Sequence, residues 1–285
     1  MTFTEYLEQK KFSRKTVLTY GFYITRFLSW LDNEGLRPEL FTYNDLLDFM
    51  GDCQYKGVTK RTVHGTLGII RHYCNHLITE KRRTDNPAAG VFIKGLVRKL
   101  PVNLLTIEEL EELFKQYSIQ LSVERSKKIM FGLMVYQGVS VGELMRIETG
   151  DIKLKEGKIK IKGTKKTNER LLNLNAGQMT ELQQYLNENK FKEGCLFTET
   201  TKSKTSKRNI NNRIKYLFIQ LKKLNPKVIN AKQIRSSVIT HWLRQNNLRQ
   251  VQYMAGHKYV SSTERYQVNN LDDLKNELQQ HHPMS

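Results

Sequence analysis

Apolar residues in the first eighty positions recur every three or four residues, the spacing that places them on one face of an α-helix. These runs cover residues 17–28, 46–49 and 63–77. Each run follows a Ser or Thr whose side-chain oxygen can accept a hydrogen bond from a free amide at a helix start: Ser13 or Thr16, then Thr42, then Thr59. The pattern predicts a bundle of three or four helices before residue 80.

A second set of helical patterns begins after residue 104. Thr106 and Glu109 have the spacing of a capping box, in which hydroxyl and carboxylate each bind the other residue's backbone amide. Residues 126–137 are rich in Met, Leu and Phe, which indicates a buried helix, and Gly138 is placed to end it. Another helix is expected to open near Ser140.

Between residues 152 and 174 the apolar positions alternate with polar ones, which is the period of β-strands. Turn-forming residues lie at Glu156-Gly157 and within 163–168. From about Met179 the helical period returns, interrupted by a lysine-rich loop at 200–208 and by Asn225-Pro226. The predicted fold class is mainly α with one small antiparallel β-sheet.

Length and composition predict two domains. A chain of 285 residues is long enough for two compact cores, and basic and turn-forming residues between 81 and 101 interrupt the regular patterns. We place an N-terminal helical domain at 1–86, a linker at 87–103 and a second domain at 104–285. Lys94, Arg98 and Lys99 in the linker either follow a DNA backbone or belong to a plain solvated linker.

The charge of the chain makes nucleic acid the expected partner. Lys and Arg number 47 against 28 Asp and Glu, a net charge of +19 that both halves share. Such an excess neutralises phosphates and releases their counterions, although some basic proteins bind no nucleic acid. No apolar run reaches the ~18–20 residues of a membrane span, and no secretion signal opens the chain. We therefore expect a cytoplasmic, nucleoid-associated protein.

The sequence gives no sign of a metal centre or a nucleotide cofactor. Its three cysteines, Cys53, Cys74 and Cys195, form no CxxC pair and have no histidine at ligand spacing. A phosphate-binding glycine loop of the GxxxxGK[ST] type and an acidic cluster for Mg²⁺ are both missing from the sequence. Neither a disulfide framework nor a zinc site is expected.

One constellation in the second half of the chain is specific. Lys232 and Arg235 are separated by two residues, His257 follows Arg235 by 22 residues within a Gly-His pair, and Tyr266 follows His257 by 9 residues. This order and spacing resembles the tyrosine recombinase family, which includes Xer-like enzymes and integrases of phages and transposons. Segments 136–144 and 161–170 resemble the family's box around its first catalytic arginine and its lysine-bearing hairpin. The N-terminal portion resembles the family's helical core-binding domain.

These residue types suit attack on a DNA phosphodiester, because the transition state gains negative charge that cationic donors stabilise. Arg235 is able to hold two phosphate oxygens at once, and Lys232 and His257 would add donors or accept the nucleophile's proton. The resemblance implies that Tyr266 is the nucleophile. A phenol is a weak nucleophile until neighbouring cations favour its ionised form.

Lysines have two expected roles. One on the hairpin would protonate the departing 5′ oxygen; Lys165 is our choice, with Lys162 and Lys166 as close alternatives that also qualify for DNA contact. On the N-terminal helices, the residues expected to read DNA sequence are Lys60, Arg61 and His64. Trp242 is interpreted as a core residue.

The chain departs from the family at one position. Ser140 stands where the family's box carries its first catalytic arginine, and a serine supplies no charge. Three explanations compete. In the first, another cation (Arg146, Lys160 or Lys162) takes over the role of the missing arginine. In the second, the remaining cations suffice and DNA cleavage is slower. In the third, the protein binds DNA without cutting it.

The resemblance implies strand exchange through a 3′-phosphotyrosine intermediate, with no ATP and no metal, by two domains that clamp duplex DNA. It also implies a DNA-bound homotetramer built by exchanging C-terminal tails, for which Leu271, Leu274 and Leu278 offer an amphipathic helix. The alternatives are an enzyme like type IB topoisomerases and a catalytically silent DNA-binding accessory protein. Integration, excision, inversion and dimer resolution are all roles compatible with this resemblance.

Overall fold

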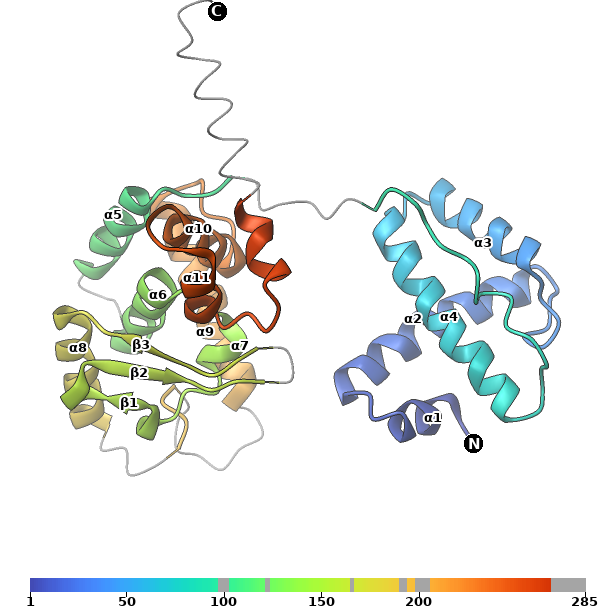
Figure 1. The fold of residues 1–285 in the computed structure, drawn as a ribbon, viewed down its shortest axis with the longest axis horizontal. Coiled ribbons are helices and arrows are strands. Elements are labelled where there is room, and N and C mark those ends of the chain that lie inside the picture. Colours follow the sequence, from blue (N-terminus) through green and yellow to red (C-terminus); the bar gives the residue numbers. More distant parts are fainter. Residues whose placement is uncertain (97–102, 121–123, 165–166, 190–193, 198–205, 268–285) are drawn as a thin grey trace, which may run out of the picture. The chain divides into compact units, whose positions relative to one another are not determined.

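The computed structural model describes residues 1–96, 103–120, 124–164, 167–189, 194–197 and 206–267 (Figure 1). The chain divides into two compact units, Met1–Arg98 and Lys99–Ser285, here called the N-terminal and the C-terminal unit. Described residues are mainly helical, with one three-stranded antiparallel sheet. The predicted fold class is therefore confirmed.

Four helices make up the N-terminal unit: α1 (Phe3–Gln9), α2 (Arg14–Asn33), α3 (Tyr43–Tyr55) and α4 (Lys60–Thr79). The side-chain oxygens of Ser13, Thr42 and Thr59 accept from a backbone N–H three residues further on and so begin α2, α3 and α4. The helix starts predicted from these residue types are confirmed.

Aromatic rings fill the core of the N-terminal unit. The ring of Phe27 meets those of Phe41 and Phe49 edge to face, with centroids 5.2 and 5.0 Å apart. After α4 the chain folds back onto this core, where Arg71 donates to the carbonyl oxygens of Ala88 and Val91 at 3.0 and 3.1 Å. Val91 is also buried, so residues after position 86 pack against the helices of the N-terminal unit.

The helices of the C-terminal unit enclose a large apolar core. They are α5 (Ile107–Ser118), α6 (Arg125–Gln137), α7 (Val141–Leu144), α8 (Ala176–Asn189), α9 (Ser206–Leu224), α10 (Ala231–Gln245) and α11 (Leu248–Ala255). α6 is buried on every side and packs against α5, α8 and α10, as its composition predicts. Gly138 ends α6 in the left-handed conformation at φ +57°, and Trp242, a core residue as expected, packs against it.

The sheet consists of β1 (Ile152–Lys153), β2 (Lys158–Ile161) and β3 (Arg170–Asn173) in the order β1-β2-β3. Ile159 pairs with Ile152 on one side and with Leu172 on the other, so the apolar positions of all three strands share the face that meets the core. Leu154 alternates like a strand residue, but it starts a 3-10 turn that leads into Gly157.

One boundary predicted after the sheet is wrong. Residues 206–208, assigned to the lysine-rich loop at 200–208, belong to the first turn of α9. Four apolar side chains at helical spacing later in α9, Ile210, Ile214, Leu217 and Leu221, are buried in the core. Because a helix becomes cooperative once such a face is fixed, it extends into the polar turn before it.

Membrane-spanning helices and metal-binding groups were both sought among the described residues. None of their helices is long and apolar enough to cross a membrane. Within the same ranges, no group of three or more His, Cys, Asp or Glu side chains is arranged to hold a metal ion.

Candidate active site

The Lys232–Arg235 motif lies on the first turns of α10. The side chain of Asn230 accepts a hydrogen bond from the backbone N–H of Gln233 and so begins this helix. Lys232 and Arg235 are three residues apart and share one face of the helix. Lys232 is exposed, whereas the side chain of Arg235 is only 14% exposed.

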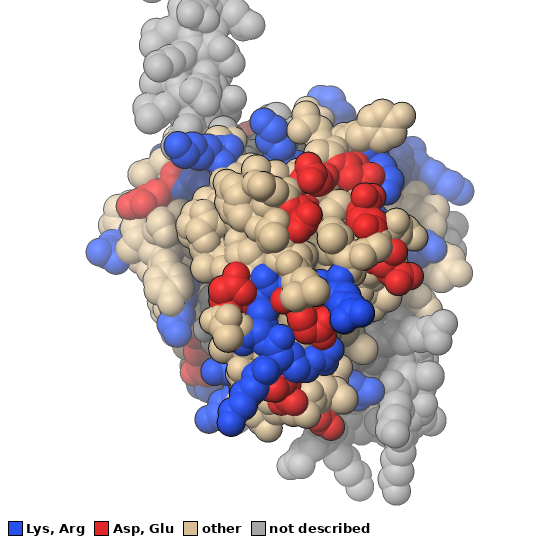
Figure 2. Space-filling model, turned by 90° about the vertical axis from the view of Figure 1, so that its right-hand side faces the viewer, with Lys and Arg blue, Asp and Glu red and all other residues tan. Residues whose placement is uncertain are grey.

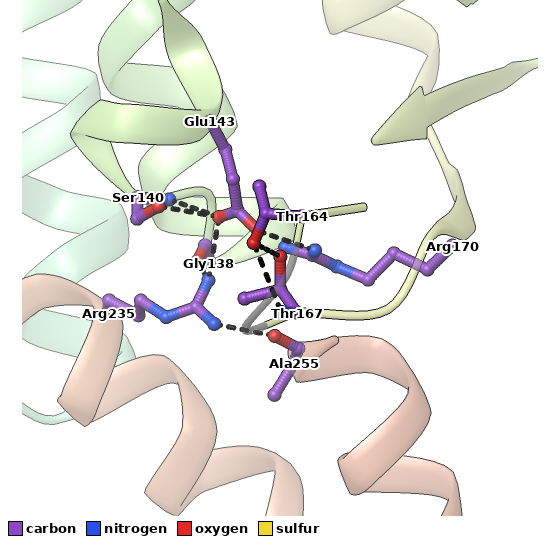
Figure 3. A network of polar contacts seen from close by, with 8 residues as sticks. All are labelled: Gly138, Ser140, Glu143, Thr164, Thr167, Arg170, Arg235 and Ala255. Carbon is purple, nitrogen blue, oxygen red and sulfur yellow. Dashed lines mark hydrogen bonds and ion pairs between the residues drawn. The ribbon is translucent and has the colours of Figure 1, made fainter. Parts of the chain in front are cut away.

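Arg235 is held by three segments that are distant in sequence (Figure 3). Its Nη1 donates to the carbonyl oxygen of Gly138 at 2.6 Å and to Glu143 at 3.1 Å, and its Nη2 donates to the carbonyl oxygen of Ala255 at 2.5 Å. A guanidinium carries five N–H donors, so these bonds leave two for a ligand. The ends of α6 and α11 and the start of α7 thus fix the orientation of Arg235.

Glu143 is the buried centre of the network. Its side chain is 2% exposed and accepts hydrogen bonds from Arg170 at 2.6 Å, from Arg235, and from both the backbone N–H and the hydroxyl of Ser140. Burial alone would raise the pKa of Glu143, but the hydrogen bond from Arg170 and the charges of Arg235 and Arg170 outweigh it and lower that pKa to about 2. Glu143 is therefore a permanent anion between two arginines.

Ser140 takes part in the same network without reaching outwards. It is the residue before α7, and its hydroxyl lies 2.7 Å from the Glu143 carboxylate. The sequence predicts that a helix starts near Ser140 and that this serine stands where related proteins have a charged residue. The structure adds that its hydroxyl is bound to Glu143.

Gly256, the first residue of the Gly-His pair, has to be a glycine for two reasons. It ends α11 in the left-handed conformation at φ +66°, which side chains disfavour. A Cβ atom there would also collide with Nη1 of Arg170 and lie 3.1 Å from the carbonyl oxygen of Asn168. The Gly-His motif is thus the place where the β2–β3 hairpin and the buried Arg170 close against α11, with Asn168 donating to the carbonyl oxygen of Gly256.

His257 lies beside the tyrosine that the sequence singles out. Its Nδ1 is 2.8 Å from the hydroxyl of the buried Thr263, which orients the ring and leaves Nε2 for other partners. Burial, followed by the positive charges of Arg235, Arg170 and Arg265, lowers the pKa of His257 to about 4. The imidazole is therefore neutral at physiological pH.

Tyr266 lies in a helical segment that follows the Gly-His pair, at 261–267. Its ring is half-buried against the core of the C-terminal unit and lies parallel to the His257 ring, with an interplanar angle of 13° and centroids 6.1 Å apart. Burial lowers the pKa of Arg235, whereas the electrostatic interaction with Tyr266 raises it. The phenol is therefore within electrostatic range of the arginine.

The lysines expected on the hairpin divide into two groups. Lys160 forms an ion pair with Glu169 at 3.0 Å, and Lys162 forms ion pairs with Glu148 at 2.6 Å and Asp151 at 3.7 Å. The other two candidates, Lys165 and Lys166, lie outside the described residues. The structure thus brings together Arg235, His257 and Tyr266, with Lys232 on the same helix face as Arg235.

Two participants, Glu143 and Arg170, were missed as site residues by sequence reasoning. Both stand in segments that the resemblance covers, but their charge gives no sign of burial. The available signal for Glu143 was its position three residues after Ser140, which is the spacing of a capping box. No pattern in the sequence indicated that Arg170 would be fully buried.

The expected DNA-contacting residues of the N-terminal unit are on its surface. Lys60, Arg61 and His64 are exposed on the first turns of α4, and Lys94 is exposed after it; Arg98 and Lys99 lie outside the described residues. Figure 2 shows one face of this unit, on which basic side chains gather in the lower part with some carboxylates among them, below a separate acidic group. Charge on this face is thus unevenly distributed.

Comparison with known protein families covers nearly the whole chain. Residues 103–272 match the model of the phage integrase family, and residues 1–81 match that of the phage integrase N-terminal SAM-like domain. Among curated proteins, tyrosine recombinase XerC of Bacillus licheniformis is 26% identical, covering 99% of this chain and 95% of its own. Tyrosine recombinase XerD of Haemophilus influenzae is 24% identical, covering 98% of this chain and 95% of its own.

Solved structures share the fold at low identity. The Tn1549 transposon integrase in complex with transposon right end DNA superposes with a TM-score of 0.69 at 14% identity, covering 99% of both chains. A lambda integrase dimer bound to a COC′ core site superposes with a TM-score of 0.68 at 16% identity, covering 92% of both chains.

Proposed function

The chain belongs to the phage integrase family of tyrosine recombinases, and we propose that it is a site-specific recombinase that cuts and rejoins DNA through Tyr266. The observation that carries this proposal is the convergence of Arg235, His257 and Tyr266 from three separate segments around one buried network. Family membership supports DNA breakage and rejoining as the general reaction. The residue roles that follow are our proposal.

In the proposed step the phenolic oxygen of Tyr266 forms a bond to phosphorus while the bond to the 5′ oxygen breaks, leaving a 3′-phosphotyrosine. The two free N–H groups of Arg235 bind the non-bridging oxygens, whose charge grows in the transition state. Neutral His257 accepts the phenol proton through Nε2, and Lys232 adds a second cation. The leaving 5′ oxygen takes its proton from a hairpin lysine, with Lys165 as the first candidate. Attack by a 5′ hydroxyl of the partner duplex reverses these bond changes, so neither a nucleotide nor a metal is required.

The His257 pKa predicts how cleavage depends on pH. Because this pKa is lowered to about 4, the imidazole stays neutral from about pH 8 down to about pH 5, and its protonation should not reduce the cleavage rate in that range. A histidine with an ordinary pKa of about 6.5 would instead titrate there. We expect wild type to show no downward inflection near pH 6.5 in single-turnover cleavage.

The same shift has a consequence for stability. The unfolded chain binds a proton at His257 below about pH 6.5, and the folded protein does so only below about pH 4, so His257 reduces stability progressively as the pH falls through this window. His257→Gln should remove this contribution, which chemical denaturation at pH 7 and pH 5 measures.

The cleavage experiment has a contrary outcome as well. An inflection in the wild-type cleavage rate near pH 6.5 that His257→Gln abolishes would contradict the assignment of a neutral imidazole.

We further propose that Ser140 replaces the first catalytic arginine of the family. The proposal rests on its place in the segment that matches the family's box and on its position beside Glu143 and Arg235. A serine hydroxyl bound to Glu143 offers no charge to a phosphate. This observation is also what favours the second candidate function, a DNA-binding accessory protein that does not cut.

Duplex DNA and copies of the same chain are the proposed partners. The lambda integrase has been solved as a dimer bound to a COC′ core site and as a tetramer bound to a Holliday junction, which supports a tetramer on DNA here. We propose that the two units clamp the duplex, with 1–86 as the core-binding domain, 87–103 as the linker and 104–285 as the catalytic domain. Tail exchange through Leu271, Leu274 and Leu278 is part of the proposal. These three positions lie outside the part of the chain that the structure describes.

Covalent trapping tests the function. A binding site is first selected from a pool of random duplexes, and the selected duplex is then prepared with a 5′-bridging phosphorothiolate, whose leaving sulfur cannot religate efficiently. Wild type should form an SDS-resistant adduct, and mass spectrometry of the digested adduct should place the nucleotide on the peptide that contains Tyr266. Specific binding without any adduct would support the accessory protein instead, and relaxation of supercoils without exchange between two duplexes would support a topoisomerase.

A further inference from the structure

Among the described residues, the proposed active site offers a phosphate one guanidinium, that of Arg235, and the exposed ammonium group of Lys232. Arg235 has two N–H groups left for a phosphate, and Ser140 contributes none. Arg170 does not fill the gap, because its side chain is 0% exposed and its Nη1 is bound to Glu143. A second guanidinium has to come from elsewhere if the phosphate is to be held from two sides.

Two described lysines of the hairpin, Lys160 and Lys162, are already engaged in ion pairs. Lys160 pairs with Glu169, and Lys162 pairs with Glu148 and Asp151. The bond to Glu148 and the charges of both carboxylates raise the pKa of Lys162, so this lysine stays charged but has its charge balanced. Moving either lysine to a phosphate would break an ion pair that exists in the free protein.

Arg146 is a cation near Ser140 that is not committed in this way. It is the second residue after the end of α7 and is exposed, and among the residues that the structure describes no carboxylate forms an ion pair with it. Its backbone N–H donates to the carbonyl oxygen of Glu143 at 2.8 Å, which places it in the turn after α7, and its Nη1 lies 4.0 Å from the position that a Cβ of Gly142 would occupy.

This position brings the guanidinium back towards Ser140. Gly142 precedes Arg146 by four residues and therefore lies on the same face of the turn, and with no side chain of its own it leaves that surface to the arginine. Ser140 stands two residues before Gly142, at the start of the same short helix. Residues two apart do not share a helix face, so the Arg146 side chain has to turn about this helix to approach Ser140, and that movement breaks no ion pair in the described part of the chain.

We propose that Arg146 supplies the phosphate-binding charge that Ser140 lacks. The inference rests on the proposed function and adds a catalytic residue to it. Arg146 contributes no proton and forms no bond to the DNA; it binds a non-bridging oxygen of the scissile phosphate opposite Arg235 and stabilises the charge that develops as Tyr266 attacks.

A four-variant experiment tests this role. The rate of adduct formation on the phosphorothiolate duplex is measured under single turnover for wild type, Arg146→Ala, Ser140→Arg and the double variant. Arg146→Ala should slow the reaction on the order of 100-fold, as removal of one charge-stabilising donor does. Ser140→Arg should accelerate the Arg146→Ala protein much more than it accelerates wild type, because only the former lacks the second guanidinium.

Two controls separate catalysis from structure. Arg249→Ala removes the same charge from an exposed position on α11 and should change the rate by less than about threefold, as surface substitutions usually do. On a duplex whose scissile phosphate is a neutral methylphosphonate, the effect of Arg146→Ala should shrink, since the anionic oxygen that it binds is missing. A purely structural role would give the same loss on both substrates.

The outcomes are distinct. Equal rates for wild type and Arg146→Ala overturn the role of Arg146 while leaving Tyr266 chemistry intact. An adduct that forms only when Ser140→Arg is present shows that nothing fills the gap, and it also overturns the inference. Absence of an adduct in all four proteins, with specific DNA binding retained, overturns the proposed function, and the role of Arg146 is rejected with it.

Discussion

Tyr266→Phe is expected to abolish the covalent attachment of the protein to DNA. The substitution removes only the phenolic oxygen, and the ring that stacks on His257 and packs against the core of the C-terminal unit remains. Loss of an enzyme nucleophile reduces rates by at least about 10³- to 10⁴-fold, which takes the adduct below detection on a gel. DNA affinity and the midpoint of thermal unfolding should stay close to those of wild type.

Tyr259→Phe is the matched control for this experiment. Tyr259 is seven positions before Tyr266 and its side chain is exposed, so its hydroxyl should be dispensable and the adduct should form at the wild-type rate. If Tyr266→Phe still became attached to DNA, another side chain would be the nucleophile. Digestion of that adduct would identify the residue and refute the mechanism proposed for Tyr266.

Glu143→Ala should destabilise the C-terminal unit by about 3–5 kcal/mol, the usual effect of removing one partner from a buried ion pair. Glu143 joins two arginines, and its loss would leave Arg170 fully buried with no carboxylate beside it. The Nε and Nη2 atoms of Arg170 already have no hydrogen-bond partner in the described structure. Urea denaturation at pH 7 measures the effect, with Glu156→Ala, an exposed glutamate on the surface turn after β1, as the control.

The pH dependence provides an independent check. The pKa of Glu143 is about 2 in the folded protein and near its ordinary value of 4.5 in the unfolded chain, so its stabilising contribution is present above pH 4.5 and is lost as the pH falls towards 2. Glu143→Ala and Glu143→Gln should both lack this part of the acid sensitivity, because neither side chain has a carboxyl group to protonate. A loss below about 1 kcal/mol for Glu143→Ala would mean that the buried arginines find other partners.

The same variant connects stability with catalysis. Glu143 fixes Arg235 from one side while the carbonyl oxygens of Gly138 and Ala255 fix it from the others. Even under conditions in which Glu143→Ala remains folded, we therefore expect slower adduct formation, because Arg235 gains freedom that it must lose again at the phosphate.

Local patterns in the sequence were enough to locate most elements and the order of the chemical groups. Hydrophobic spacing and the capping residues Ser13, Thr42, Thr59 and Thr106 located helix starts correctly, because a helix start depends on residues within one turn of it. Gly138 likewise marked the end of α6. The intervals between Arg235, His257 and Tyr266 pointed to a shared site, since spacing in a known family carries information that local propensity does not.

Which charged side chains remain unpaired at the surface, by contrast, depends on how the chain folds. Arg170 and Glu143 are 27 residues apart, and Arg235 and Glu143 are 92 apart, so nothing local announces that these groups share one buried network. The same holds for Gly256, whose missing side chain makes room for Arg170, and for Lys160 and Lys162, which carboxylates from other segments neutralise. The physical reason is that burial and pairing depend on contacts between distant segments, whereas capping and periodicity depend on neighbours along the chain.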